Sequence, residues 1–193
     1  MIMKSIPLTI PNALSLYRLF SVPFICILIA LGHDMVFAVL FTINQITDIL
    51  DGYIARRYKL QSDIGVLLDS YADIGSYLIA FLAILKFHPQ LFSDYGFWLG
   101  GFFFIYALQL IVCKIKHGRW VAGLHLYSCK LTGYVQGTFL VVLFCYGFIS
   151  WFFYAMILIG VLAELEVIAI NLLSSKPILN AKGLYWVFKE KRL

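Results

Sequence analysis

Four aspartates stand out in this sequence because they lie inside segments that are otherwise apolar. They form two pairs, Asp48 with Asp51 and Asp69 with Asp73, whose members are three and four residues apart. At these spacings both members of a pair lie on one face of a helix. An aspartate in the middle of a membrane helix costs about 2.5–3.5 kcal/mol on insertion scales, so four of them indicate a functional site.

The chemistry that suits such a cluster is the binding of a divalent cation. Carboxylates that lie close together repel one another, so a positive charge must lie among them or some must be protonated. The two helix faces that carry the aspartates contain no lysine. Oxygen ligands without histidine or thiolate favour Mg²⁺, Mn²⁺ or Ca²⁺ over zinc or copper. The sequence therefore predicts a metal site at Asp48, Asp51, Asp69 and Asp73, with Mg²⁺ or Mn²⁺ as the expected ion.

The elements that must position these aspartates are membrane-spanning helices. Of the 193 residues, 62% are hydrophobic and only 13% are charged, which lies outside the range of ordinary soluble domains. Apolar stretches of about 20 residues, each able to cross a bilayer as a helix, recur along the chain. The expected spans are about residues 14–32, 35–57, 63–87, 95–115, 121–147 and 151–173. We therefore expect an all-α, polytopic membrane protein with one domain over residues 1–193, an interfacial segment before the first span and an interfacial tail from about residue 177.

The basic residues orient these spans. If the N-terminus is cytoplasmic, every lysine and arginine except Lys86 falls on the cytoplasmic side, as the positive-inside rule requires. Both termini and the four aspartates are then expected on the cytoplasmic side of the inner (cytoplasmic) membrane. The same asymmetry explains the net charge of +5, so no nucleic-acid partner is expected.

The stretch from Asp48 to Asp73 also carries a recognisable motif. It reads DILDGYIARRYKLQSDIGVLLDSYAD and fits D-x-x-D-G-x-x-A-R-x8-G-x-x-x-D-x-x-x-D at every fixed position. It resembles the CDP-alcohol phosphotransferase (CDP-alcohol phosphatidyltransferase) family. The opening Asn12, Ser15 and Arg18, which follow N-x-x-S/T-x-x-R, and the six spans extend the resemblance more loosely.

The resemblance implies a homodimeric six-helix fold whose pocket opens to the cytoplasm and holds two divalent ions beneath a CDP-linked lipid. Asp48, Asp51 and Asp69 would be metal ligands, and Asp73, which also lies near the metals, would be the general base. The residues that would line the CDP-lipid site are Gly52, Ala55 and Gly65, with Arg56 as a polar part of the same motif. The implied reaction moves a phosphatidyl group from CDP-diacylglycerol to a polar alcohol and releases CMP.

Candidate contacts to the acceptor alcohol lie between the fourth and fifth spans, at Arg119, His125 and Lys130. Lys130 is expected about two turns inside the fifth span. Arg119 and Lys130 together would suit a phosphorylated acceptor such as glycerol 3-phosphate or inositol phosphate. After Asp73 the chain reads IGSY, without the lysine that follows in many phosphatidylglycerophosphate and cardiolipin synthases. Serine, free inositol or another phospholipid therefore remain possible acceptors.

A divalent-cation transporter or channel is the alternative function, because it would also place acidic residues inside spans. All four aspartates lie near one face of the membrane, and the outer halves of the spans carry no matching polar path. A permeation route would need one, so the sequence favours the enzyme.

Overall fold

The fold consists of helices throughout the described part of the chain. The computed structural model describes residues 9–60, 62–118, 126–174 and 183–189, and within these ranges it contains seven helices and no strand. They are α1 (Ile10–Leu31), α2 (Asp34–Arg57), α3 (Asp63–Phe87), α4 (Gln90–His117), α5 (Tyr127–Tyr146), α6 (Ser150–Leu173) and α7 (Leu184–Lys189). The first six are long and apolar enough to cross a membrane. The expected all-α fold with six spans is confirmed.

Helix α1 begins earlier than expected because its first turn is capped. The Oγ1 atom of Thr9 accepts a hydrogen bond from the backbone N–H of Asn12 at 3.4 Å, and a proline lies in the first turn, as is common at helix starts. Residues 10–13 therefore belong to α1 and not to a separate interfacial segment, while residues 1–8 lie outside the described residues. The helix ends at Gly32, whose φ of +81° is the left-handed conformation that favours glycine.

The later helices differ from the expected spans mainly at their ends. Helix α4 extends beyond residues 95–115 at both ends, whereas α2, α3 and α6 closely match the expected bounds. Helix α5 begins at Tyr127, and residues 119–125 before it lie outside the described residues. The expected interfacial tail contributes α7, where the ring of Trp186 lies 5.9 Å from that of Tyr127. Whether this tail lies in the interface stays a prediction.

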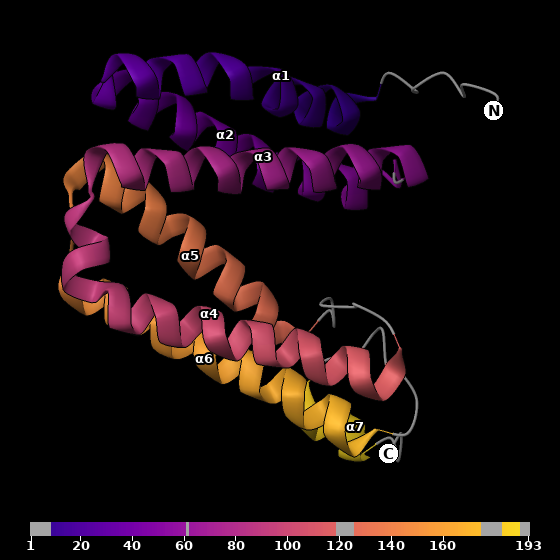
Figure 1. Cartoon of the computed structure of the whole chain (residues 1–193). Helices are drawn as coiled ribbons and strands as arrows, with labels where there is room; N and C mark the ends of the chain where they lie inside the picture. The colour runs from indigo at the N-terminus through magenta and orange to yellow at the C-terminus, as the bar shows by residue number, and fades with distance from the viewer. Residues whose placement is uncertain (1–8, 61, 119–125, 175–182, 190–193) are drawn as a thin grey trace. The chain divides into compact units, whose positions relative to one another are not determined.

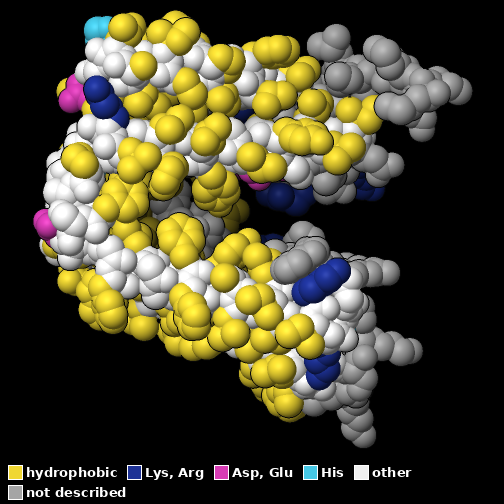
Figure 2. All heavy atoms as spheres, viewed as in Figure 1, with side chains coloured by type: hydrophobic (Ala, Val, Ile, Leu, Met, Phe, Trp, Pro, Cys, Tyr) yellow, Lys and Arg dark blue, Asp and Glu magenta, His cyan; other side chains and the backbone are white. Residues whose placement is uncertain are grey.

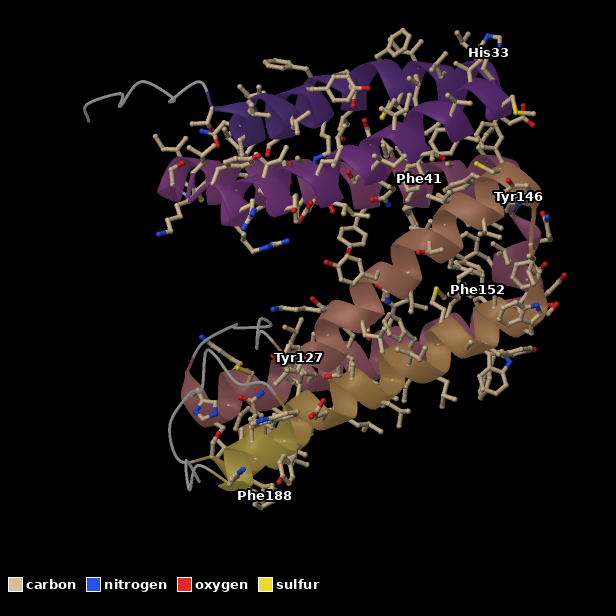
Figure 3. The ribbon with its side chains drawn as sticks, turned by 180° about the vertical axis from the view of Figure 1, so that it is seen from behind. His33, Phe41, Tyr127, Tyr146, Phe152 and Phe188 are labelled. Atoms are coloured by element: carbon tan, nitrogen blue, oxygen red, sulfur yellow. The ribbon has the colours of Figure 1, made fainter. Side chains whose placement is uncertain are left out.

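The helices gather into two compact units, and the first consists of residues 1–89 and 144–146. Within it α1 packs against both α2 and α3, so the three helices run side by side (Figure 1). Residues 58–62 join α2 directly to α3, which makes these two helices antiparallel neighbours. An aromatic cluster packs part of this unit, with the Phe144 ring 4.8 Å from that of Phe37 and 5.2 Å from that of Phe41. Figure 3 labels Phe41, on α2.

The second unit consists of residues 90–143 and 147–193. Here α4 packs along α6. The Phe102 ring of α4 lies so close to Gly160 of α6 that a Cβ atom on Gly160 would be 2.6 Å from the ring. Helix α7 packs on α6 through a small core of Leu126, Val167, Ile170 and Val187. Hydrophobic side chains cover much of the visible surface of the helices in each unit, as a lipid-facing surface requires (Figure 2). The single domain over residues 1–193 remains a prediction.

Candidate active site

A polar face of α1 lies against α2 and α3. Asn12, Ser15 and Arg18 follow one another at intervals of three residues, so they share one side of the helix, and all three are buried. Most of α1 is apolar, and its packing on both neighbouring helices encloses this polar side. The first helix therefore contributes a third wall to the site that carries the aspartates.

The guanidinium group of Arg18 connects all four aspartates. Its Nη1 atom donates to Asp48 Oδ1 at 2.5 Å and to Asp73 Oδ1 at 3.0 Å, while Nη2 donates to Asp51 Oδ2 at 3.1 Å and to Asp69 Oδ1 at 2.6 Å. Each terminal nitrogen thus joins one aspartate of α2 to one of α3. The two pairs converge on one point, as the antiparallel packing of their helices predicts.

This arrangement corrects the expected charge balance. The repulsion argument required a positive charge among the carboxylates, and the absence of lysine from the two aspartate-bearing faces suggested a divalent cation alone. Arg18 supplies such a charge from α1, a third helix. Its side chain is only 2% exposed. Four carboxylates around one guanidinium still carry a formal charge of about −3 when all are ionised, so further cations remain favourable.

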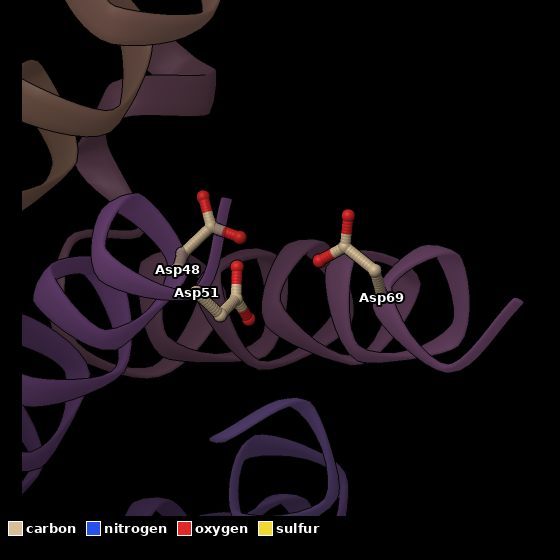
Figure 4. A group of neighbouring side chains, drawn as sticks. All are labelled: Asp48, Asp51 and Asp69. Carbon is tan, nitrogen blue, oxygen red and sulfur yellow. The ribbon is translucent and has the colours of Figure 1, made fainter. Parts of the chain in front are cut away.

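The residues present fit a hard metal ion. Asp48, Asp51 and Asp69 each offer a carboxylate oxygen, and the three oxygens lie within 4.8 Å of one another (Figure 4). Within the described residues, this group contains neither histidine nor cysteine, which is the donor chemistry of Mg²⁺ or Mn²⁺ sites. Asp73 is not part of this three-carboxylate group but lies next to it, because Arg18 contacts all four aspartates.

The cluster is buried on one side and open on the other. The Asp51 side chain is 5% exposed, whereas those of Asp48, Asp69 and Asp73 are 37%, 45% and 45% exposed. On the buried side, Ser15 Oγ donates to Asp51 Oδ2 at 3.1 Å. Asp51 therefore anchors the cluster to α1, and the other three carboxylates remain accessible to a ligand.

Comparison with known proteins identifies the family. A family model described as CDP-alcohol phosphatidyltransferase matches residues 8–165, from α1 to most of α6. The chain belongs to the CDP-alcohol phosphatidyltransferase family. The match covers far more of the chain than the aspartate motif that first indicated the family, and it includes helices of both compact units.

Individual members of the family match over shorter stretches. The CDP-diacylglycerol–glycerol-3-phosphate 3-phosphatidyltransferase of Cereibacter sphaeroides is 35% identical over 80 residues, which make up 39% of this chain and 36% of that protein. The protein of the same name from Rickettsia bellii is 37% identical over 79 residues, or 38% of this chain and 44% of that one. A cardiolipin synthase (CMP-forming) / mitochondrial hydrolase fusion protein of Schizosaccharomyces pombe is 42% identical over 65 residues, or 34% and 11%. These matches span less than half the length of each relative. No solved structure matches the chain significantly.

The small residues of the family motif lie where helices or side chains approach closely. A Cβ atom on Gly65 would lie 2.6 Å from Asn12 Oδ1 and 3.0 Å from Ser62 Oγ. A Cβ atom on Gly52 would lie 3.2 Å from Nη1 of Arg56, so the Arg56 side chain folds back over this glycine. Gly65 therefore has a packing role between α1 and α3, in addition to the lipid-site role that the family resemblance implies.

The packing at Gly65 gives a testable stability effect. Gly65→Ala is expected to destabilise the protein by about 1–3 kcal/mol through overpacking, because the new methyl group would overlap Asn12 Oδ1. Thermal unfolding in detergent measures this effect as a lower midpoint. The control is Gly100→Ala in α4, where a Cβ atom has nothing within 4 Å. That variant should unfold at the wild-type temperature or above it, because alanine favours a helix over glycine. A stable Gly65→Ala protein would contradict the close packing of α1 on α3.

The predicted acceptor residues are only partly described. Arg119 and His125 lie outside the described residues. Lys130 lies in the first turn of α5, because the helix begins at Tyr127, and so the expected depth of two turns inside the span is wrong. Its side chain is exposed, with Nζ 5.9 Å from the centre of the Tyr127 ring. Whether it contacts the acceptor stays a prediction.

Two carboxylates of α6 escaped the sequence interpretation. Glu164 and Glu166 lie inside the sixth span. Glu166 accepts hydrogen bonds from Ser128 Oγ at 2.5 Å and from the backbone N–H of Leu184 at 2.7 Å. It therefore ties the starts of α5 and α7 to α6. The cost of a charge in a span, which singled out the aspartates, is the signal that would have found both.

Proposed function

We propose that this protein is a metal-dependent phosphatidyltransferase that uses CDP-diacylglycerol and glycerol 3-phosphate and releases CMP. The observation that carries the proposal is the convergence of four carboxylates from α2 and α3 on one partly exposed site in a member of this family. A diphosphate substrate is itself negatively charged, so a site for it must supply cations. The three-carboxylate group offers the oxygen ligands that such cations need.

The metal ligands are Asp48, Asp51 and Asp69, which would hold two Mg²⁺ or Mn²⁺ ions. When bound, these ions would neutralise the diphosphate and the charge that develops on it. Asp51 is the most buried of the three and accepts a hydrogen bond from Ser15 Oγ, so it would be the most firmly held of the three ligands. Asp48 and Asp69 are partly exposed, so they would face the substrate.

Asp73 is the general base of the proposed reaction. Arg18 donates to its Oδ1 atom at 3.0 Å, which would orient the carboxylate, and Oδ2 would then take the proton. The acceptor oxygen forms a bond to the phosphorus that bears the diacylglycerol, the bond from that phosphorus to the oxygen of CMP breaks, and Asp73 takes the hydroxyl proton. One bond to phosphorus forms as another breaks, so no further reactant is required.

The remaining motif residues would bind the CDP-lipid. Gly52, Ala55 and Gly65 present little or no side chain near the aspartates, which would let the cytidine and diphosphate approach the backbone on the sides that Arg56 and Asn12 do not cover. Arg56 is exposed and lies over Gly52, one turn after Asp51, where its charge would face a phosphate.

Two features support glycerol 3-phosphate as the acceptor. The similar proteins of Cereibacter sphaeroides and Rickettsia bellii are named for this acceptor. The cationic Arg119 and Lys130, with His125 between them, would suit its phosphate group. We propose these three residues as its binding contacts.

The proposed cellular context follows from the charge asymmetry of the spans. The protein would lie in the inner membrane, with both termini and the aspartates at the cytoplasmic side. There the site meets a lipid donor and a water-soluble acceptor. The protein would form a homodimer, as the family resemblance implies. The alternative, a cation channel or transporter, would need polar groups through the outer halves of the spans as well.

An acceptor panel tests the proposed reaction. Purified protein with Mg²⁺ and CDP-diacylglycerol is expected to release CMP when glycerol 3-phosphate is added, and to release at least about tenfold less with inositol phosphate, inositol, serine or phosphatidylglycerol. Chromatographic measurement of CMP checks this, with lipid extraction to name the product. Release with another acceptor alone would keep the reaction class and replace glycerol 3-phosphate. Folded protein that neither releases CMP nor binds CDP-diacylglycerol would favour the transporter.

A further inference from the structure

The four aspartates have a resident cation, which is the guanidinium of Arg18. We propose that Arg18 is a positioning residue that holds the four carboxylates together when no metal is bound and competes with divalent ions for their oxygens. The metal part of this inference rests on the proposed function. The geometry of Arg18 itself does not.

The first argument is the way in which Arg18 divides its contacts. Nη1 and Nη2 each contact one aspartate of α2 and one of α3, at distances from 2.5 to 3.1 Å. A planar guanidinium presents several donors in a fixed fork, whereas an ammonium is a point charge. One side chain can therefore hold two helices and four carboxylates in register.

The Arg18 guanidinium is buried, so its charge must be compensated by the four aspartates around it. The Arg18 side chain is 2% exposed, and its Nε atom is buried without a hydrogen-bond partner in the described part of the chain. A buried charge is unfavourable unless nearby opposite charges compensate it. Arg18 depends on the four carboxylates, and they depend on Arg18 when no other cation is present.

The same carboxylates would be needed by a metal ion. Asp69 Oδ1 and Asp51 Oδ2 accept from Nη2, and Asp48 Oδ1 accepts from Nη1. These carboxylates are the three whose ligand oxygens lie close enough together to share an ion. A divalent ion bound there would lie near the guanidinium, and like charges at that distance repel. Metal binding must therefore weaken the Arg18 contacts with these three carboxylates, whereas the contact of Nη1 with Asp73, which lies outside the group, can persist.

The neighbouring side chains support a fixed resting position for Arg18. Ser21 Oγ donates to the Arg18 carbonyl oxygen at 2.7 Å and accepts from Asn44 Nδ2 at 2.9 Å, while Ser15 lies one turn earlier and holds Asp51. The backbone of α1 is thus tied to α2 on both sides of Arg18. Only the Arg18 side chain would need to move when an ion enters.

The test measures Mn²⁺ affinity by electron paramagnetic resonance and thermal unfolding with and without Mn²⁺, in detergent-purified full-length protein. Arg18→Met keeps the length of the side chain but removes its charge. We expect a lower unfolding midpoint without metal, recovery of most of that loss with Mn²⁺, and Mn²⁺ affinity at least about tenfold higher than in wild type. Arg18→Lys keeps the positive charge but loses the planar fork of donors. Its Mn²⁺ affinity and its metal-free unfolding midpoint should therefore lie between those of wild type and Arg18→Met. The control Arg57→Met, at the exposed end of α2, should leave both properties unchanged.

The results separate positioning from a merely structural role. Unchanged or weaker Mn²⁺ affinity in Arg18→Met would overturn the competition, whatever its stability. If Arg18→Met does not fold, the Mn²⁺ affinity of Arg18→Lys provides the test. An affinity equal to that of wild type would overturn the proposal. Folded wild-type protein that binds no Mn²⁺ would overturn the metal site and the competition together. In that case, a lower metal-free midpoint for Arg18→Met than for Arg57→Met would still support positioning of the carboxylates by Arg18.

Discussion

Asp73→Asn is expected to lower the rate of CMP release by about 10²- to 10⁴-fold, because it removes the proposed general base. Asparagine has nearly the same shape, so packing should change little. Its side chain cannot take the proton of the acceptor hydroxyl at neutral pH, although its carbonyl oxygen can still accept the hydrogen bond from Arg18. The loss should therefore appear in kcat and not in folding.

Steady-state CMP release, with thermal unfolding alongside, measures this effect. Asp94→Asn provides the matched control, since it makes the same chemical change at an exposed position near the start of α4. That variant should retain wild-type activity. Mn²⁺ affinity of Asp73→Asn should remain within about threefold of wild type, because Asp73 lies outside the three-carboxylate group. Turnover at the wild-type rate would rule out Asp73 as the base.

The helices could be predicted from the sequence because their signal is long and redundant. A span of about 20 apolar residues tolerates several exceptions, so the six spans were found despite the aspartates. The ends were less certain because single local contacts decide them. The cap at Thr9 starts α1 before the fully apolar region, and α5 starts at Tyr127, which places Lys130 near a helix end.

The aspartate cluster was equally predictable, but its charge partner was not. Each aspartate pair shares a helix face, and a short connection makes the two helices neighbours, so convergence follows from local information. The contacts of Arg18 depend on how α1 packs against the other two helices, which helical periodicity alone does not determine. A basic residue near the cytoplasmic end of a span is also what the positive-inside rule leads one to expect. The regular spacing of Asn12, Ser15 and Arg18 was visible, but only the structure shows which helices it faces.

Asp51→Asn is expected to remove metal binding together with activity, in contrast to Asp73→Asn. Asp51 is the most buried carboxylate of the cluster and belongs to the three-carboxylate group. Loss of a residue that only orients a metal ligand typically costs 10- to 100-fold in affinity, so loss of a ligand should weaken Mn²⁺ binding by more than about 100-fold. CMP release should fall to the level seen when a chelator removes divalent ions from the wild type.

The contrast between the two variants assigns separate roles to chemically identical side chains. Mn²⁺ titration by electron paramagnetic resonance and CMP release at increasing Mn²⁺ concentration should agree for Asp51→Asn, and the chelated wild type should regain activity when Mn²⁺ is restored. Asp51→Asn also leaves Ser15 Oγ and Arg18 Nη2 facing an amide in place of a carboxylate, so its metal-free stability is expected to change. Wild-type Mn²⁺ affinity in folded Asp51→Asn would remove Asp51 from the metal site. Equal loss of Mn²⁺ binding in both variants would mean that Asp73 is a metal ligand as well, and that proton transfer must be reassigned.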